Sequence, residues 1–202
     1  MIVVPVYSLV FLVLTMGARC LSRPFVVKNI RRIFGTAVVG MVGVLAVLSG
    51  LQYSAWAAGS APTKFLLAPH YSHWYFLQYV GWRFWAPYFI ALLLGAIIGL
   101  LAHWYNKRHG GDLLYDDEPY LIALAIFLVG QPGWIVYFFG MLLLALLVHL
   151  GIATATWLRP RRFATTEYYR FSLYDFWLPV AAFVILIMQW LLTMEWFLLL
   201  KP

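Results

Sequence analysis

The residues with the clearest capacity for chemistry are acids in the stretch between His103 and Trp134. Four carboxylates fall within seven residues there, after a basic segment and directly before an apolar run: they are Asp112, Asp116, Asp117 and Glu118. A fifth candidate, Asp175, directly precedes the last apolar run. Two carboxylates held close together share a proton, because both cannot ionise cheaply, and such a pair can activate water for amide hydrolysis.

The composition defines the surroundings of these acids. Of the 202 residues, 64% are hydrophobic and 10% are charged, which indicates an integral membrane protein and excludes an ordinary soluble domain. A helix needs roughly 20 apolar residues to cross the hydrocarbon layer. We therefore expect an all-α fold, a single integral membrane domain over residues 1–202 that forms a polytopic bundle of about six transmembrane helices. The expected spans are approximately 2–18, 33–58, 85–105, 119–133, 135–158 and 176–199.

The basic residues predict the orientation of this bundle. Eleven of the 14 Lys and Arg residues, all except Lys64, Arg83 and Lys201, fall in alternate loops. Loops rich in Lys and Arg face the cytoplasm, so both termini are expected outside and the acidic cluster inside. The net charge of +7 is explained by this asymmetry. The lipid bilayer is then the expected partner, and nucleic acid is not.

Small residues predict where helices touch. Gly40 and Gly43 in the second span, and Gly95 and Gly99 in the third, are expected to face other helices, because glycine allows two backbones to approach closely. The Gly and Pro residues at 130–133 are expected to turn the chain back and make a helical hairpin.

The remaining ionisable residues give weaker signals. His70 and His73 have a spacing that could serve a metal, but no carboxylate lies nearby, so no metal and no cofactor are expected. His149, within the fifth span, is expected to be a hydrogen-bonded packing residue. Cys20 is the single cysteine and has no partner for a disulfide.

Two interpretations of the acids remain open. In one, Asp175 approaches Asp117 or Glu118, since these residues begin the sixth and fourth spans at similar depth. In the other, the acids complement the positive ends of helix dipoles and pair with cations. The cations available for such pairs are Lys107, Arg108, Arg159, Arg161 and Arg162.

The stretch from Ile97 to Gly130 resembles part of the type IV prepilin peptidases, which are membrane aspartyl peptidases. In that family a helix ends in a basic loop, a Gly-x-Gly-Asp motif follows, and the next helix reads Leu-x-Ala with a glycine about twelve residues after the aspartate. Leu121, Ala123 and Gly130 are in place here, and the segment from Arg170 is similar to the family's last-helix entry.

The resemblance implies an aspartic endopeptidase of a bacterial inner (plasma) membrane that cleaves prepilin-like leader peptides. Asp117 or Glu118 would supply one carboxylate and Asp175 the other. The literal Gly-Gly-Asp, which ends at Asp112, lies several residues early, and Glu118 stands where the motif aspartate belongs. The family's other catalytic aspartate lies on an earlier helix, but no acid precedes Asp112 here.

The sequence therefore leaves several functions open. The chain could be a divergent or inactive peptidase-like protein. It could instead be a non-catalytic membrane subunit or assembly protein that packs with partner subunits through its glycine faces. A small transporter would need ionisable residues in the middle of a span, whereas these acids sit at span ends.

Overall fold

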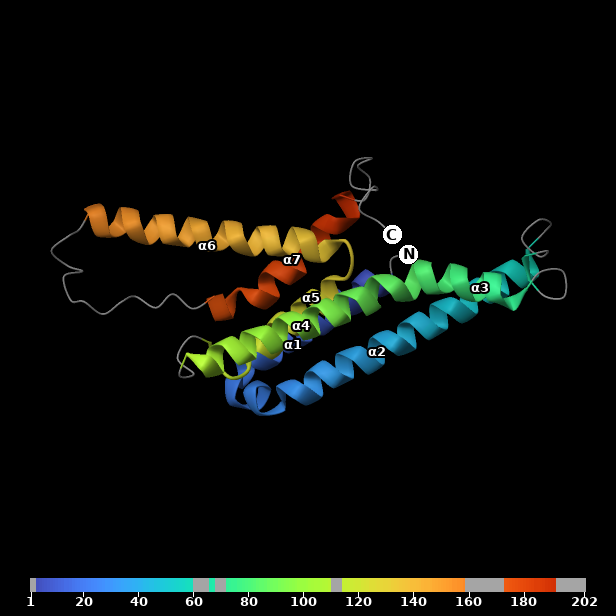
Figure 1. Ribbon diagram of the computed structural model, residues 1–202, viewed down its shortest axis with the longest axis horizontal. Coiled ribbons are helices and arrows are strands. Elements are labelled where there is room, and N and C mark those ends of the chain that lie inside the picture. Colours follow the sequence, from blue (N-terminus) through green and yellow to red (C-terminus); the bar gives the residue numbers. More distant parts are fainter. Residues whose placement is uncertain (1–2, 60–65, 68–71, 110–113, 159–172, 192–202) are drawn as a thin grey trace.

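The computed structural model describes residues 3–59, 66–67, 72–109, 114–158 and 173–191 (Figure 1). Over these residues the chain is helical, with no strand. Four helices are long and apolar enough to cross a membrane: Val3–Leu21, Arg23–Ala58, His73–Arg108 and Gly133–Thr154. The all-helical class is thus confirmed. The other two predicted spans are shorter helices in the part of the chain described.

Helix α1 (Val3–Leu21) is followed almost at once by α2 (Arg23–Ala58), and the two pack against each other. The hydroxyl of Tyr7 donates a hydrogen bond to the carbonyl oxygen of Ala37, at 2.9 Å. The second span was predicted to begin at residue 33, but α2 begins ten residues earlier. The intervening basic segment is helical because Lys and Arg are good helix formers and Pro24 stands in the first turn, where its missing N–H is tolerated.

The third predicted span, 85–105, is the central part of a longer helical segment. Helix α3 (His73–Val80) continues through a π-helical turn, η2 (Gly81–Trp85), into α4 (Ala86–Arg108). In that turn the N–H of Ala86 donates to the carbonyl oxygen of Gly81. The following proline cannot donate and crowds the preceding turn, which accounts for the local widening. Figure 1 shows α2 and α3 continuing together past the other helices at one end.

Helix α5 (Glu118–Val129) is the centre of the molecule. All of its residues except Tyr120 are buried, and it contacts α1, α2, α4, α6 and α7. Its 12 residues amount to about 18 Å at 1.5 Å per residue, which is shorter than a hydrocarbon layer of about 30 Å. The predicted span 119–133 is therefore a short enclosed helix. It ends at Gly130, whose φ of 69° suits glycine, and the predicted hairpin turn follows.

The two glycines of α4 allow it to pack tightly on α5. A Cβ at position 95 would lie 2.8 Å from the carbonyl oxygen of Ala123, and one at position 99 would lie 3.0 Å from that of Pro119. The prediction that Gly95 and Gly99 face another helix is confirmed. Gly40 also faces a neighbour, since its Cβ would collide with the Tyr7 ring, but for Gly43 the prediction was wrong because it is exposed and no atom lies within 4 Å.

Helix α6 (Gly133–Leu158) leaves the bundle as it proceeds. Its first turns pack on α5 and on α7 (Trp177–Leu191), which follows a short 3-10 turn, η3 (Leu173–Asp175). No residue from Leu142 to Thr154 is buried. Figure 1 shows this half of α6 running away from the other helices.

Candidate functional site

The predicted acids lie where α5 begins, and a polar clamp from α4 holds the segment before it. The amide nitrogen of Asn106 donates to the carbonyl oxygen of Leu114, and the Leu114 N–H donates back to the Asn106 amide oxygen, both at 2.9 Å. Asn106 is itself buried. These reciprocal bonds fix the chain between residues 114 and 117 and so determine where the carboxylates of Asp117 and Glu118 begin α5.

Glu118 is buried and fully engaged, with only 3% of its surface exposed. One carboxylate oxygen accepts the indole N–H of Trp177 at 2.7 Å. The other accepts the backbone N–H of Tyr115 at 3.1 Å. Because an unpaired buried carboxylate is costly, these donors explain how Glu118 is tolerated inside the protein.

Asp117 is equally buried, at 3% exposure. Its carboxylate accepts a hydrogen bond from the hydroxyl of Tyr174, which is also buried. Burial, and then the hydrogen bond to Asp117, raise the pKa of Tyr174 to about 12. The tyrosine therefore stays protonated, and remains a donor, throughout the physiological range.

Asp175 faces the other way. Its side chain is 79% exposed and lies 2.5 Å from the guanidinium of Arg19, which is 11% exposed. Arg19 also donates to the backbone carbonyl oxygen of Tyr174 at 3.1 Å. The expected approach of Asp175 to Asp117 or Glu118 is not what the structure has.

The reason lies in the local geometry of η3. In 3-10 and α-helical turns, residues three apart point roughly the same way, whereas the residue next to the first points elsewhere. The chain passes from η3 into α7 at Trp177. Tyr174 and Trp177 therefore both face α5 and reach its two acids, while Asp175 turns outward to Arg19. Helices α5 and α7 meet, as the hypothesis required. However, Tyr174 and Trp177 contact the two acids, and Asp175 does not.

A layer of arginine and aromatic side chains covers this cluster. The guanidinium of Arg19 lies 3.8 Å from the centre of the Tyr174 ring, and that of Arg23 lies 4.6 Å from it. Arg23 also lies 5.2 Å from the ring of Tyr115, which meets the Tyr174 ring edge-on at 4.9 Å. Arginine commonly stacks on aromatic faces in this way.

We define the carboxylate cluster as the side chains that meet here. They come from α1, the segment before α5, α5 itself and η3 with α7, and they are Arg19, Tyr115, Asp117, Glu118, Tyr174, Asp175 and Trp177.

Sequence reasoning identified the acids of the cluster but missed their donors. Tyr174 and Trp177 flank Asp175, so the donors lie one and two residues from the predicted site residue. Arg19 was counted only as a marker of orientation, although it stands in the last turn of α1. A search for aromatic donors flanking each helix start would have found Tyr174 and Trp177.

Some predicted residues lie outside the described part of the chain. Asp112 is one, and the basic group of Arg159, Arg161 and Arg162 is another. Among the described residues, no group of three or more His, Cys, Asp or Glu side chains could hold a metal ion. The cluster's chemistry is thus that of carboxylates with hydrogen-bond donors.

Comparisons with family models, curated proteins and solved structures found no match for this chain. The function is therefore argued from the geometry alone.

Proposed function

We propose that this chain is a non-catalytic helical membrane protein, a subunit or assembly protein whose buried carboxylates join helices. The observation that carries the proposal is that three acids already have hydrogen-bond or ion-pair partners within the protein. Glu118 accepts from Trp177 and Tyr115, Asp117 accepts from Tyr174, and Asp175 pairs with Arg19. In this role the acids connect the start of α5 to η3 and α7, and η3 to α1.

Catalysis by such acids would need a different arrangement. A general base must direct a lone pair at a water or substrate within hydrogen-bond reach. Both oxygens of Glu118 already accept bonds, and only 3% of its surface and of that of Asp117 is exposed. A shared proton would also require two carboxylates in contact, whereas the pairs formed here join acids to an arginine or to aromatic donors.

Helix α6 supports the role of a subunit. His149 was expected to be a hydrogen-bonded packing residue, but it is exposed on α6, and no hydrogen bond to it occurs within the described residues. A polar side chain within an apolar span normally finds a polar partner inside a bundle. A helix of another membrane protein is the partner that this position would accept.

The proposed orientation follows the positive-inside rule. The end of the bundle that bears Arg19, Arg23 and Lys107 lies on the cytoplasmic side of a bacterial inner membrane, and both termini lie on the opposite side. Reporter fusions after Asn106 and after Gln131 then give opposite sides, although α5 itself is shorter than the hydrocarbon layer. Reporters on the same side would contradict the orientation.

A peptidase is the second candidate, because one observation favours it. α5 and α7 are neighbours, and Asp117 and Glu118 meet the residues on either side of Asp175. In this reading the Arg19 to Asp175 pair opens, and Asp175 joins Glu118 or Asp117 to cleave prepilin-like leader peptides.

One assay separates the two candidates. The purified protein is reconstituted in lipid vesicles with a prepilin-like leader peptide, and cleavage is followed by mass spectrometry. We expect no cleavage by the wild type or by Arg19→Ala, which frees Asp175. Asp116→Asn is the matched control, because Asp116 is an exposed acid beside the cluster. Cleavage that is lost in both Glu118→Gln and Asp175→Asn but kept in Asp116→Asn, with unchanged melting temperatures, would establish the peptidase.

A crosslinking experiment tests the subunit role. A photo-crosslinking residue is placed at position 149 or, as a control, at the exposed position 97 of α4. In native membranes, position 149 is expected to give a discrete adduct and position 97 a diffuse lipid background. Identical diffuse labelling at both would remove the argument for a partner helix.

A further inference from the structure

An apolar groove lies on the outside of the bundle where α2, α4 and α5 meet. Its volume is about 250 Å³, and its lining includes Phe34 of α2, Gly99 and His103 of α4, and Pro119 and Tyr120 of α5. It lies where Gly95 and Gly99 bring the α4 and α5 backbones together, and the Phe34 ring lines its α2 side. The groove is separate from the carboxylate cluster, since neither Asp117 nor Glu118 lines it.

The groove opens toward the surroundings of the bundle. Leu100, which lines it, is 69% exposed, and Ile97, one turn away on the same helix, is also exposed. Both belong to a helical segment that is long and apolar enough to cross a membrane. Lipid chains are therefore the medium that reaches the groove.

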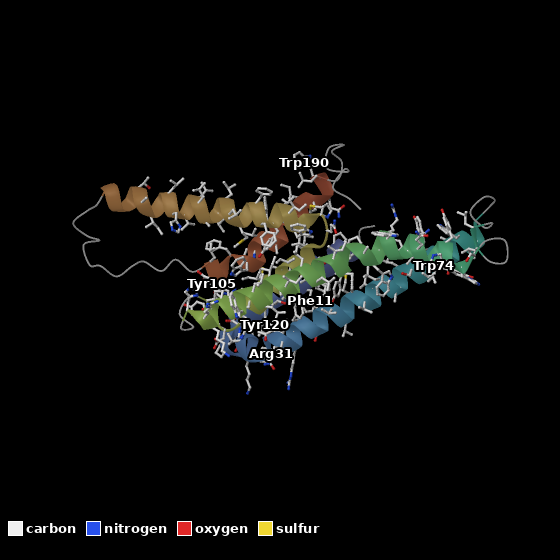
Figure 2. All side chains as sticks on the ribbon, in the orientation of Figure 1. Phe11, Arg31, Trp74, Tyr105, Tyr120 and Trp190 are labelled. Atoms are coloured by element: carbon white, nitrogen blue, oxygen red, sulfur yellow. The ribbon has the colours of Figure 1, made fainter. Side chains whose placement is uncertain are left out.

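One end of the groove is basic. The guanidinium of Arg31 lies 5.4 Å from the centre of the Tyr120 ring, and Figure 2 shows these two residues together beside α2. Arg31 stands one turn before Phe34 on α2, so both lie on the face turned to the groove. On α4, His103 lines the groove and Lys107 follows one turn later, toward the basic end of the helix. Arg31, His103 and Lys107 are all exposed.

We propose that this groove binds an anionic phospholipid, with an acyl chain against Phe34 and Gly99 and the phosphate at Arg31. The charge of the rim carries the choice of occupant. Basic pockets between transmembrane helices at the cytoplasmic side are suited to anionic headgroups. The apolar side of a partner helix would fit the groove but would leave Arg31 without an anion.

The stacked position of Arg31 suits a phosphate. Its guanidinium lies over the Tyr120 ring and can still direct N–H edges sideways, where a phosphate accepts two of them. On α4, the His103 ring lines the groove, and Lys107 adds positive charge one turn further along the helix. Neither of two other acids lines the groove. Asp116 is exposed in the segment before α5, and Asp175 is paired with Arg19.

The test measures lipid retained by the purified, delipidated protein. The protein in detergent is titrated with phosphatidylglycerol or phosphatidylcholine, and bound lipid is counted by native mass spectrometry. We expect one phosphatidylglycerol to bind roughly tenfold more tightly than phosphatidylcholine, because the choline cation of phosphatidylcholine neutralises its phosphate and is repelled by the basic rim. Excess inorganic phosphate is expected not to displace it, because the acyl chain supplies part of the affinity.

Two variants with matched controls locate the site. Arg31→Ala is expected to remove most of the preference for phosphatidylglycerol, while Arg32→Ala, which removes the same charge on the next residue, keeps it. Ala96→Phe fills the groove and is expected to lower binding of either lipid, whereas Ile97→Phe, on the exposed side of the same helix, does not. Melting temperatures of all four variants establish that they fold.

Several outcomes would overturn the proposal. Equal binding of the two lipids, or equal loss in Arg31→Ala and Arg32→Ala, would leave only general attraction to basic surface. Displacement of the lipid by inorganic phosphate would make this an ion site without an acyl groove. A second copy of the chain that excludes lipid, and that Ala96→Phe releases, would show the groove to be a contact between protein helices.

Discussion

Helices α5 and α6 are joined by a short turn and are both built almost entirely of apolar residues, yet their surroundings differ completely. α5 is enclosed on nearly every side, whereas α6 exposes most of its length. The difference comes from what each helix offers its neighbours. α5 presents Ala123 to the glycines of α4 and carboxylates to the donors of α7, while α6 beyond Met141 presents mainly leucines. Apolar composition alone therefore does not distinguish a buried helix from an exposed one.

The largest expected effect comes from blocking the approach of α4 to α5. Gly95→Leu puts a side chain where a Cβ alone would lie 2.8 Å from a backbone oxygen. We expect a loss of about 3 kcal/mol or more in the free energy of unfolding, because neither backbone can move away cheaply. The matched change on α6 is Gly151→Leu, where no atom lies within 4 Å. Thermal unfolding in detergent is the measurement, and similar melting temperatures for the two variants would contradict the contrast between the helices.

The next effect concerns the acids that begin α5. Glu118→Ala leaves the Trp177 indole N–H and the Tyr115 backbone N–H without their acceptor. Leaving these two partly buried donors unpaired is expected to lower the free energy of unfolding by about 2 kcal/mol or more. Asp116→Ala, at the exposed residue directly before the buried pair, is expected to change little. A melting temperature equal to that of the wild type in Glu118→Ala would mean that the carboxylate does not join the helices.

A smaller and pH-dependent effect is expected at Tyr174. Tyr174→Phe removes the hydrogen bond to Asp117, worth about 1 kcal/mol. Because the pKa of Tyr174 is raised from 10.0 to about 12, the folded state keeps this proton to higher pH than the unfolded state. The contribution is complete below pH 10 and is lost as the pH rises through about 12.

The measurement for Tyr174 is the difference in melting temperature between the wild type and Tyr174→Phe. It is expected to be constant up to about pH 10 and to shrink toward pH 12. A difference that grows with pH would reverse the sign and reject the assignment.

The smallest effect is expected on α6. His149→Leu replaces an exposed side chain that makes no hydrogen bond within the described residues. The free energy of unfolding of the isolated chain, measured by thermal unfolding in detergent, should change by no more than about 0.5 kcal/mol. A large loss would mean that His149 packs within its own chain, as its sequence context first indicated.

The sequence was sufficient for the features that depend on local chemistry. Apolar runs predicted the helices, the Gly and Pro residues at 130–133 predicted the turn, and Gly95 and Gly99 predicted a close helix contact. Helix boundaries were less accessible. α2 extends back to Arg23 because Lys and Arg form helix as readily as most apolar residues.

The arrangement of the candidate site depended on geometry that spacing does not contain. Whether Asp175 or its neighbours would face α5 was decided by the 3-10 turn, which rotates each residue by about a third of a circle. Nor could a periodic pattern show that α5 is enclosed, since it is apolar on every face. Only the positions of other helices distinguish these cases.

The long separation between the acids and their donors has a consequence for biosynthesis. Tyr174 and Trp177 come 57 and 59 residues after the carboxylates that they bind. When α5 leaves the ribosome, the side-chain donors that will pair with the buried carboxylates of Asp117 and Glu118 have not yet been made. The start of α5 must therefore stay in water, or under the protection of an insertion factor, until α7 arrives. Closure of the bundle is in this sense a late event of translation, and α7 completes it.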